Sequence, residues 1–360
     1  MSKLHPSAIL PPSSRLSAGH GTRFLLCRTL GLLALAIVGG GAAAACGLLS
    51  DTGFIAYTEG PEGTRDISVV RPDGSHRRVV INHPADDFAP RWSANGQRLA
   101  FLSDRDGNVE LYVAPADGSS AMRSTNSGVA ESQPAWSPDN KHLVYVAPDY
   151  EGNPRIYLLD LSELIPRQLT FGTAGETDPA WSPDGRWIAF AGQDSDDTSL
   201  GIFLRNPDGV NRVHLTHGID HSPAWSPDST RLAFVSERDG NQELYVVNVG
   251  GGIEFPEPVR VTDHPAADYA PAWSPDGTLI GFLSRRSGYT SIYSVSPKGE
   301  DLKALTTNEV EERSLVWGPN GDLVFISELT EQPGLFIMKH DGTEQRLVTP
   351  GGTIYTFPDW

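Results

Sequence analysis

The 360-residue sequence predicts an all-β fold, a seven-bladed β-propeller closed by pairing of the C-terminal strand with the N-terminal blade. Three observations lead to this prediction: tryptophans recur with a period near 44 residues, an aromatic apolar run follows most of them, and tight-turn sequences separate the apolar runs. Glycine (37 residues) and proline (28 residues) are abundant and show no collagen period, so we expect many turns and short strands.

The tryptophans mark the repeat. Successive members of the series are 44, 45, 44, 48, 44 and 43 residues apart, and only Trp187 falls outside it. The seven members are Trp92, Trp136, Trp181, Trp225, Trp273, Trp317 and Trp360. Because a tryptophan buries about 150–250 Å² and each blade needs an apolar wedge against its neighbour, we interpret the series as part of the fold.

Each repeat contains four short apolar runs. Most tryptophans open a turn such as "WSPDG", and an aromatic residue follows about nine positions later, as in Phe101, Phe190 and Phe234. A polar loop and a second aromatic run come next, for example "ELYVAP" at 110–115, and many repeats end with an Asp-Gly turn and a β-branched run such as "VHLT". Four such runs separated by tight turns predict a four-stranded antiparallel meander, which is one propeller blade.

The ends of the repeat array predict how the ring closes. Residues 53–58, "GFIAYT", are typical of a second strand, but no tryptophan precedes them. Residues 355–360 are typical of an innermost strand, and no further strands follow. We therefore expect residues 355–360 to complete the N-terminal blade, which leaves no free sheet edge at the seam.

The first 46 residues differ from the rest. They contain four basic residues and no acid, and an apolar run ends at Cys46. We predict an export signal or a membrane or lipid anchor over 1–46, a short linker over 47–52 and a single propeller domain over 53–360. The small residues before Cys46 resemble a lipobox, in which the cysteine is acylated. Lipidation of Cys46, an uncleaved anchor over 29–49 and simple cleavage remain alternatives.

All three alternatives place the propeller outside the cytoplasm, at the outer face of the cytoplasmic membrane or in the periplasm or cell envelope, because the arginines before the apolar run stay inside. The net charge of the chain is −17, and removing the basic N-terminal segment makes the remainder more acidic still. Such a surface repels nucleic acid. We therefore expect a membrane-tethered monomer whose partner is a protein or peptide with a basic face.

The repeated phrases "PAWSPDG" and "LAFVSERDGNQELYV" resemble the TolB-like repeats, also called the WD40-like Pro-Asp family, over residues 53 to the end. The resemblance implies an exported, non-catalytic propeller that acts as a protein-binding scaffold. Peptidases with related propellers carry their catalytic triad on a separate domain, and this sequence has no Gly-x-Ser-x-Gly motif. We predict no catalytic residues.

An acid stands five residues before six of the seven tryptophans. The six acids are Asp87, Glu131, Glu176, Asp220, Asp268 and Glu312. In a propeller this position begins the innermost strand, so the repeat predicts a ring of carboxylates around one mouth of the central channel, able to bind a basic partner. The alternative is that the acids pair with arginines of nearby loops, such as Arg105, Arg238 and Arg286, each thirteen residues after its tryptophan.

Histidines raise a second hypothesis. In "HLTHGIDH", His217 and His221 fall in one loop near the predicted channel mouth with Asp220, a combination that can bind zinc, whereas His214 falls on the outermost strand. The alternative function is accordingly a metal-dependent lyase or hydrolase with its site in the central channel. We expect no other cofactor. Binding of a divalent cation at the channel mouth stays an alternative.

Overall fold

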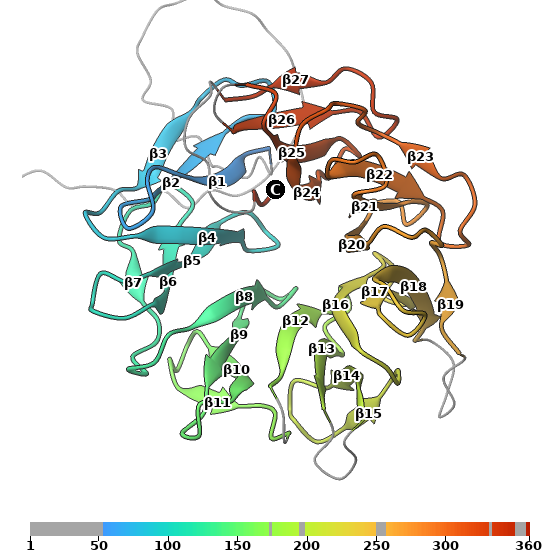
Figure 1. The fold of residues 1–360 in the computed structure, drawn as a ribbon. Coiled ribbons are helices and arrows are strands. Elements are labelled where there is room, and N and C mark those ends of the chain that lie inside the picture. Colours follow the sequence, from blue (N-terminus) through green and yellow to red (C-terminus); the bar gives the residue numbers. More distant parts are fainter. Residues whose placement is uncertain (1–52, 173–174, 194–198, 250–256, 331–332, 350–357) are drawn as a thin grey trace, which may run out of the picture. The chain divides into compact units, whose positions relative to one another are not determined.

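The computed structural model describes residues 53–360 except 173–174, 194–198, 250–256, 331–332 and 350–357. In these residues the chain forms seven antiparallel β-sheets arranged as blades around a central axis (Figure 1). The predicted all-β, seven-bladed β-propeller is confirmed. Residues 1–52, with Cys46 and the predicted signal or anchor, lie outside the described residues. In the part of the chain that is described, no helix has the length and apolar character needed to cross a bilayer.

We name the blades A to G in chain order, and in each the strands follow one another from the axis outward. Blade A has three described strands: β1 (Ile55–Glu59), β2 (Asp66–Val70) and β3 (Arg78–Ile81). The others have four. Blade B has β4 (Asp87–Trp92), β5 (Arg98–Ser103), β6 (Glu110–Pro115) and β7 (Met122–Arg123); blade C has β8 (Ser132–Trp136), β9 (His142–Pro148), β10 (Pro154–Asp160) and β11 (Pro166–Gln168); blade D has β12 (Thr177–Trp181), β13 (Ile188–Gln193), β14 (Leu200–Arg205) and β15 (Arg212–His214). Blade E has β16 (Asp220–Trp225), β17 (Arg231–Ser236), β18 (Glu243–Asn248) and β19 (Val259–Arg260); blade F has β20 (Asp268–Trp273), β21 (Ile280–Ser284), β22 (Ser291–Val295) and β23 (Lys303–Ala304); blade G has β24 (Glu312–Trp317), β25 (Leu323–Ser327), β26 (Gly334–Met338) and β27 (Arg346–Leu347).

The turn after each tryptophan explains the Ser-Pro-Asp sequence. In blade C the Ser137 hydroxyl donates to Asp139 Oδ1 (2.5 Å) and accepts from the backbone N–H of His142 (2.9 Å). Asp139 Oδ1 also accepts from the backbone N–H of Lys141 (3.0 Å), and Asn140 adopts a positive φ of 62°. Serine and aspartate thus accept hydrogen bonds from the backbone N–H groups of the turn. The residue after the aspartate has a positive φ, which favours glycine or asparagine.

The apolar core lies between neighbouring blades. Side chains from the second and third strands of one blade pack there against the next blade. The two aromatic runs face each other across these strands, for example Phe101 opposite Tyr112 with ring centroids 5.6 Å apart and Phe234 opposite Tyr245 at 5.9 Å. The tryptophans pack between blades as predicted, and Trp273 Nε1 donates to the carbonyl of Ala224 in the preceding blade at 3.0 Å. The aromatic repeat therefore builds one continuous ring of interblade contacts.

Every innermost strand of blades B to G contains a bulge that the sequence did not reveal. Three residues before each tryptophan, a residue other than glycine adopts a positive φ of 52–56°. The six residues are Ala89, Gln133, Asp178, Ser222, Ala270 and Ser314. At this point the register with the second strand shifts. A bulge redirects neighbouring side chains, so alternation along the strand does not predict where the preceding acid points.

Blade G packs against blade A and so brings the ends of the ring together. Val324 and Ile326 of blade G lie in one apolar cluster with Ile55 and Tyr57 of blade A, and Trp360 packs against the same cluster. Asp359 exchanges two backbone hydrogen bonds with Ala56, of 2.9 and 3.0 Å. Residues 355–357 of the predicted closing strand lie outside the described residues, so the complete strand pairing stays a prediction.

Candidate functional site

The innermost strands define two faces of the propeller. In blades B, E, F and G the strand begins at the repeated acid, and in blades B to G it ends at the repeated tryptophan, where the Ser-Pro-Asp type of turn follows. The acids and these turns therefore lie at opposite ends of the axis. We call them the carboxylate face and the turn face.

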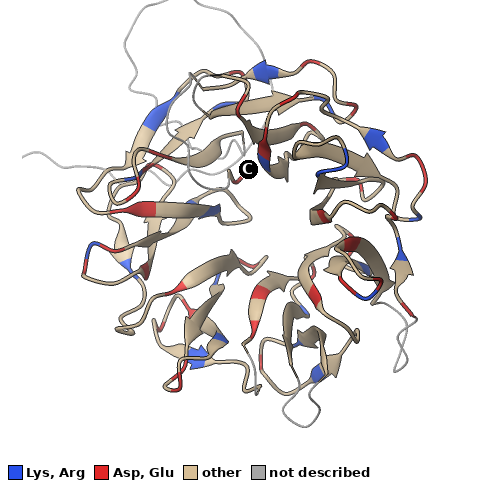
Figure 2. Cartoon of the chain, in the orientation of Figure 1, with Lys and Arg blue, Asp and Glu red and all other residues tan. Residues whose placement is uncertain are grey.

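The six acids do not face solvent, and the prediction of an exposed carboxylate ring is wrong. Figure 2 shows acidic residues on the innermost strands, but their exposed fractions are between 0 and 5%. The residues in question are Asp87, Glu131, Glu176, Asp220, Asp268 and Glu312. The physical reason is that each carboxylate accepts hydrogen bonds inside the propeller, and these partners compensate its loss of hydration.

The three aspartates pair with arginines, as the alternative predicted. Arg286 Nη2 lies 2.5 Å from Asp268 Oδ2, and Arg286 Nε donates to Ser284 Oγ at 3.0 Å. The guanidinium carbon of Arg286 also lies 4.8 Å from the ring centroid of Tyr293. The pairs Arg105–Asp87 (2.7 Å) and Arg238–Asp220 (3.0 Å) repeat this arrangement. Each arginine is held by a salt bridge and a cation–π contact in its own blade.

The three glutamates bind the preceding blade. The Thr125 hydroxyl and the Leu111 backbone N–H, both in blade B, donate to Glu131 Oε2 at 2.5 and 2.9 Å. The hydroxyl of Thr306 in blade F donates to Glu312 in the same way. Burial raises the pKa of Glu131 to about 7 and raises the pKa of Glu312 as well. The glutamates thus link neighbouring blades through hydrogen bonds.

The predicted metal ligands do not form a cluster. The ring of His217 packs against that of His214, with centroids 4.0 Å apart, whereas His221 Nδ1 lies 3.0 Å from the hydroxyl of Ser222. His214 is on the outermost strand β15, as expected. Among the described residues no group of three His, Cys, Asp or Glu side chains is placed to hold a metal ion.

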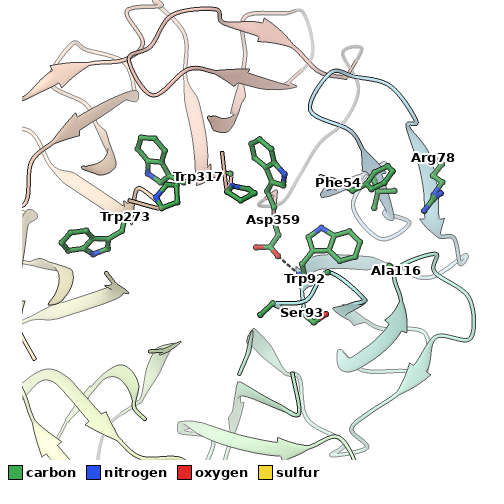
Figure 3. A pocket seen from close by; sticks show the side chains of 15 residues that line it. Phe54, Arg78, Trp92, Ser93, Ala116, Trp273, Trp317 and Asp359 are labelled. Atoms are coloured by element: carbon green, nitrogen blue, oxygen red, sulfur yellow. Dashed lines mark hydrogen bonds between the residues drawn. The ribbon is translucent and has the colours of Figure 1, made fainter. Parts of the chain in front are cut away.

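The turn face carries a cavity of about 430 Å³ (Figure 3). Four tryptophans of the repeat line it: Trp92, Trp273, Trp317 and Trp360. Phe54, Arg78 and Asp359 complete its aromatic and charged walls. These residues come from blades A, B, F and G and from the C-terminal residues, so the cavity follows the seam of the ring.

The polar atoms of this cavity depart from the repeat. Trp317 Nε1 donates to the carbonyl of Ala272 (3.0 Å), and the indoles of three other blades make the same bond to the preceding blade: Trp136, Trp225 and Trp273. The Nε1 atoms of Trp92 and Trp360 are buried and have no acceptor among the described residues. Asp359 Oδ2 accepts from the backbone N–H of Trp92 at 2.5 Å, and burial raises the pKa of Asp359. An aromatic wall with a few polar groups is the usual character of a ligand site.

This cavity was not predicted, because every tryptophan of the series was assigned to the fold. One signal was available in the sequence. No tryptophan precedes residues 53–58, so the tryptophan repeat is interrupted where the N-terminal blade begins. Among the described residues, the indole N–H groups of Trp92 and Trp360 at the seam lack acceptors, as does that of Trp181 in blade D.

Known proteins resemble this chain over parts of their length. A 64-residue segment is 39% identical to the uncharacterized peptidase YuxL of Bacillus subtilis, and a 110-residue segment is 30% identical to the protein TolB homolog of Chlorobium luteolum. The segments cover 18% and 30% of this chain, and only 10% and 24% of these relatives.

Solved structures share the fold. TolB from Acinetobacter baumannii aligns with a TM-score of 0.54 and 21% identity, covering 85% of this chain and 82% of that chain. A puromycin-hydrolyzing peptidase of Mycobacterium tuberculosis aligns with a TM-score of 0.62 and 16% identity, covering 82% of this chain and 52% of that chain. The model of the TolB β-propeller domain matches residues 48–217 and 202–360, together most of the sequence. The chain therefore belongs to the TolB β-propeller domain family.

Proposed function

We propose that this chain is a non-catalytic, extracytoplasmic protein-binding scaffold that receives a basic segment of its partner in the turn-face cavity. The observation that carries the proposal is the cavity itself: about 430 Å³, walled by four tryptophans and containing the carboxylate of Asp359. Its relatives include proteins named TolB and peptidases, and only the propeller is shared with both.

The chemistry of the cavity favours a cationic side chain on a peptide. Indole faces attract guanidinium and ammonium groups, with about 0.5–2 kcal/mol per contact depending on desolvation. A bound cation would also stabilise the charged form of Asp359, whose pKa is raised by burial. The indole N–H groups of Trp92 and Trp360, which have no acceptor in the described part of the chain, would find acceptors in peptide carbonyls.

The overall charge and the N-terminal segment support an exported location and a basic partner. The chain carries a net charge of −17, and its first 46 residues are basic and then apolar. A tether at Cys46 or through the apolar segment would hold the propeller at the membrane. The alternative of a metal-dependent enzyme gains no support from the described residues, since none of them form a three-ligand group.

Binding of a blocked arginine peptide, acetyl-(Arg-Gly)₃-amide, tests the proposed site. We expect the full-length chain to bind it with quenching of tryptophan fluorescence. Trp317→Ala and Asp359→Asn should each weaken binding about tenfold, because each removes a contact worth about 1.4 kcal/mol.

Asp276→Asn is the matched control, because Asp276 lies in the turn after β20 on the same face but does not line this cavity. Its binding should equal that of the wild type. Equal affinity in all four proteins, or no binding by the wild type, would contradict the proposed site. A tightly held divalent ion after metal loading, measured by elemental analysis, would favour the enzyme instead.

We also propose that the C-terminal segment completes blade A as its innermost strand. Blade A has three described strands where the others have four, and its strand β1 contacts Asp359 at Ala56 through two backbone hydrogen bonds. A strand in this position would close the ring without a disulfide and would hold Trp360 in the cavity wall.

A further inference from the structure

Two buried carboxylates meet where blade B contacts blade C. Glu110 begins strand β6, and Glu131 immediately precedes strand β8. Their exposed fractions are 0% and 2%. The side chain of Thr125 interacts with both, and its hydroxyl donates to Glu131 Oε2 at 2.5 Å. Two negative charges this close in a dry environment repel each other strongly.

Within the described residues, one cation compensates this pair. Arg123 Nη2 lies 2.8 Å from Glu110 Oε1, and among the described residues no Lys or Arg forms an ion pair with Glu131. Glu110 further accepts from Asn108 Nδ2 (2.9 Å) and from the backbone N–H of Ser127 (3.1 Å). Burial alone would raise the pKa of Glu110, but these hydrogen bonds and Arg123 together lower it. The charge of Glu110 is therefore well stabilised, whereas that of Glu131 is not.

The equivalent contact between blades E and F is balanced. There Glu243 and Asp268 occupy the same positions, and Thr262 donates to Glu243 Oε2 at 2.6 Å. Two arginines are present: Arg260 Nη2 lies 3.2 Å from Glu243, and Arg286 Nη2 lies 2.5 Å from Asp268. The same architecture thus holds two acids with two cations in one place and with one cation in the other.

The sequence explains the missing cation. Arg286 stands thirteen residues after Trp273, and the residue thirteen after Trp136 is Asp149, an acid. Asp149 pairs with Arg155 of its own blade at 2.9 Å. Blade C therefore supplies no positive charge to Glu131.

The second oxygen of Glu131, Oε1, is buried and lacks a hydrogen-bond partner among the described residues, as does one oxygen of Asp268, whose other oxygen is paired with Arg286. A buried, unpartnered carboxylate oxygen costs free energy unless it is protonated or occupied.

We propose that the Glu110–Glu131 pair binds one proton, held on Glu131, and that this proton couples the contact between blades B and C to pH. The titratable groups that act on Glu131 are Glu110 of blade B and the phenol of Tyr145 in β9, whereas Arg123 pairs with Glu110. Burial, opposed by the Thr125 hydrogen bond and reinforced by the charge of Glu110, raises the pKa of Glu131 to about 7.

The sign of the coupling follows from this direction. The folded protein holds the proton up to about pH 7, whereas the unfolded chain releases it near pH 4.5, the ordinary pKa of a glutamate. Stability contributed by the proton is fully present below pH 4.5 and is lost as the pH rises through about 7. Above that pH the contact between blades B and C carries an uncompensated charge.

Carboxyl ¹³C NMR of the full-length chain, labelled at Glu Cδ, tests the proposal directly. We expect one glutamate resonance to titrate near pH 7. Its absence from the spectrum of Glu131→Gln would assign it to Glu131. In Glu110→Gln the same resonance should titrate about one pH unit lower or more, because the repulsion is removed and Arg123 is released. Asp268→Asn, at the equivalent balanced contact, should leave this resonance unchanged.

Hydrogen exchange provides a second readout that does not require the Glu131 variant to fold. The protection factor of the Leu111 amide, which donates to Glu131, should fall between pH 6 and pH 8 relative to that of the Leu244 amide, which donates to Thr262. A glutamate titration that persists in Glu131→Gln, no titration between pH 6 and 8 in the wild type, or equal protection changes at both amides would overturn the proposal.

Discussion

Removal of Pro358, Asp359 and Trp360 is expected to lower the free energy of unfolding by about 5 kcal/mol. Trp360 packs on the apolar cluster shared by blades A and G, and loss of a packed tryptophan side chain costs about 3–5 kcal/mol. The truncation also removes two backbone hydrogen bonds to Ala56 and the bond from the Trp92 N–H to Asp359. Thermal unfolding should show a fall in Tm of about 10–15 °C.

The substitution Trp360→Phe is the control for this truncation. It retains an aromatic ring and the backbone pairing, so it should cost only about 1–2 kcal/mol. If the truncated protein unfolds at the wild-type temperature, the C-terminal residues do not close the ring. If Trp360→Phe is as unstable as the truncation, the effect comes from the indole and not from closure.

Arg286→Met is expected to destabilise the protein by about 3–4 kcal/mol at pH 8, because it leaves the carboxylate of Asp268 buried without its cation. Asp268 is fully buried, and Glu243 lies close enough to raise its pKa further. Burial already raises the pKa of Asp268, and loss of Arg286 should raise it more. An acid with a raised pKa in the folded state loses stability as the pH rises, so the cost of the substitution should be smaller at pH 5 than at pH 8.

Urea unfolding at both pH values measures this effect, with Arg313→Met as the matched control. Arg313 pairs with Glu328 on the surface, where the two side chains are 62% and 35% exposed. Exposed pairs of this kind contribute about 0–1 kcal/mol, and salt screens them. Similar losses of unfolding free energy in the two variants would mean that the Asp268–Arg286 pair does not stabilise the protein as a buried ion pair.

The sequence was sufficient for the fold because the signals are local and repeated. Each tryptophan precedes a turn whose serine and aspartate satisfy the backbone, as Ser137 and Asp139 do. Each pair of aromatic runs is close enough along the chain to form neighbouring strands, as Phe101 and Tyr112 do. A period of about 44 residues has room for one four-stranded meander, so each repeat forms one blade. The number of repeats then gives the number of blades.

The acids show where a repeated position misleads. Their register at the entry of the innermost strand was predicted correctly, and pairing with arginine thirteen residues after the tryptophan was a stated alternative. Their direction was not predictable, because a bulge follows each acid and because the partners of Glu131 and Glu312 are threonines of the preceding blade. The absence of an arginine thirteen residues after the tryptophan, where Asp149 and Thr330 stand instead, was a sequence signal that these glutamates have other partners.

The sequence by itself determined the strands, the seven blades, the tryptophan wedges and the acidic charge, because each depends on residue type and spacing within one repeat. Only the tertiary structure decided that the repeated acids are buried and that Glu110 and Glu131 lie close together. It also decided that Trp92, Trp273, Trp317 and Trp360 meet in one cavity at the seam. The physical reason is that burial and hydrogen-bond pairing are set by contacts between different blades. The cavity in addition requires that blade G meets blade A at the seam.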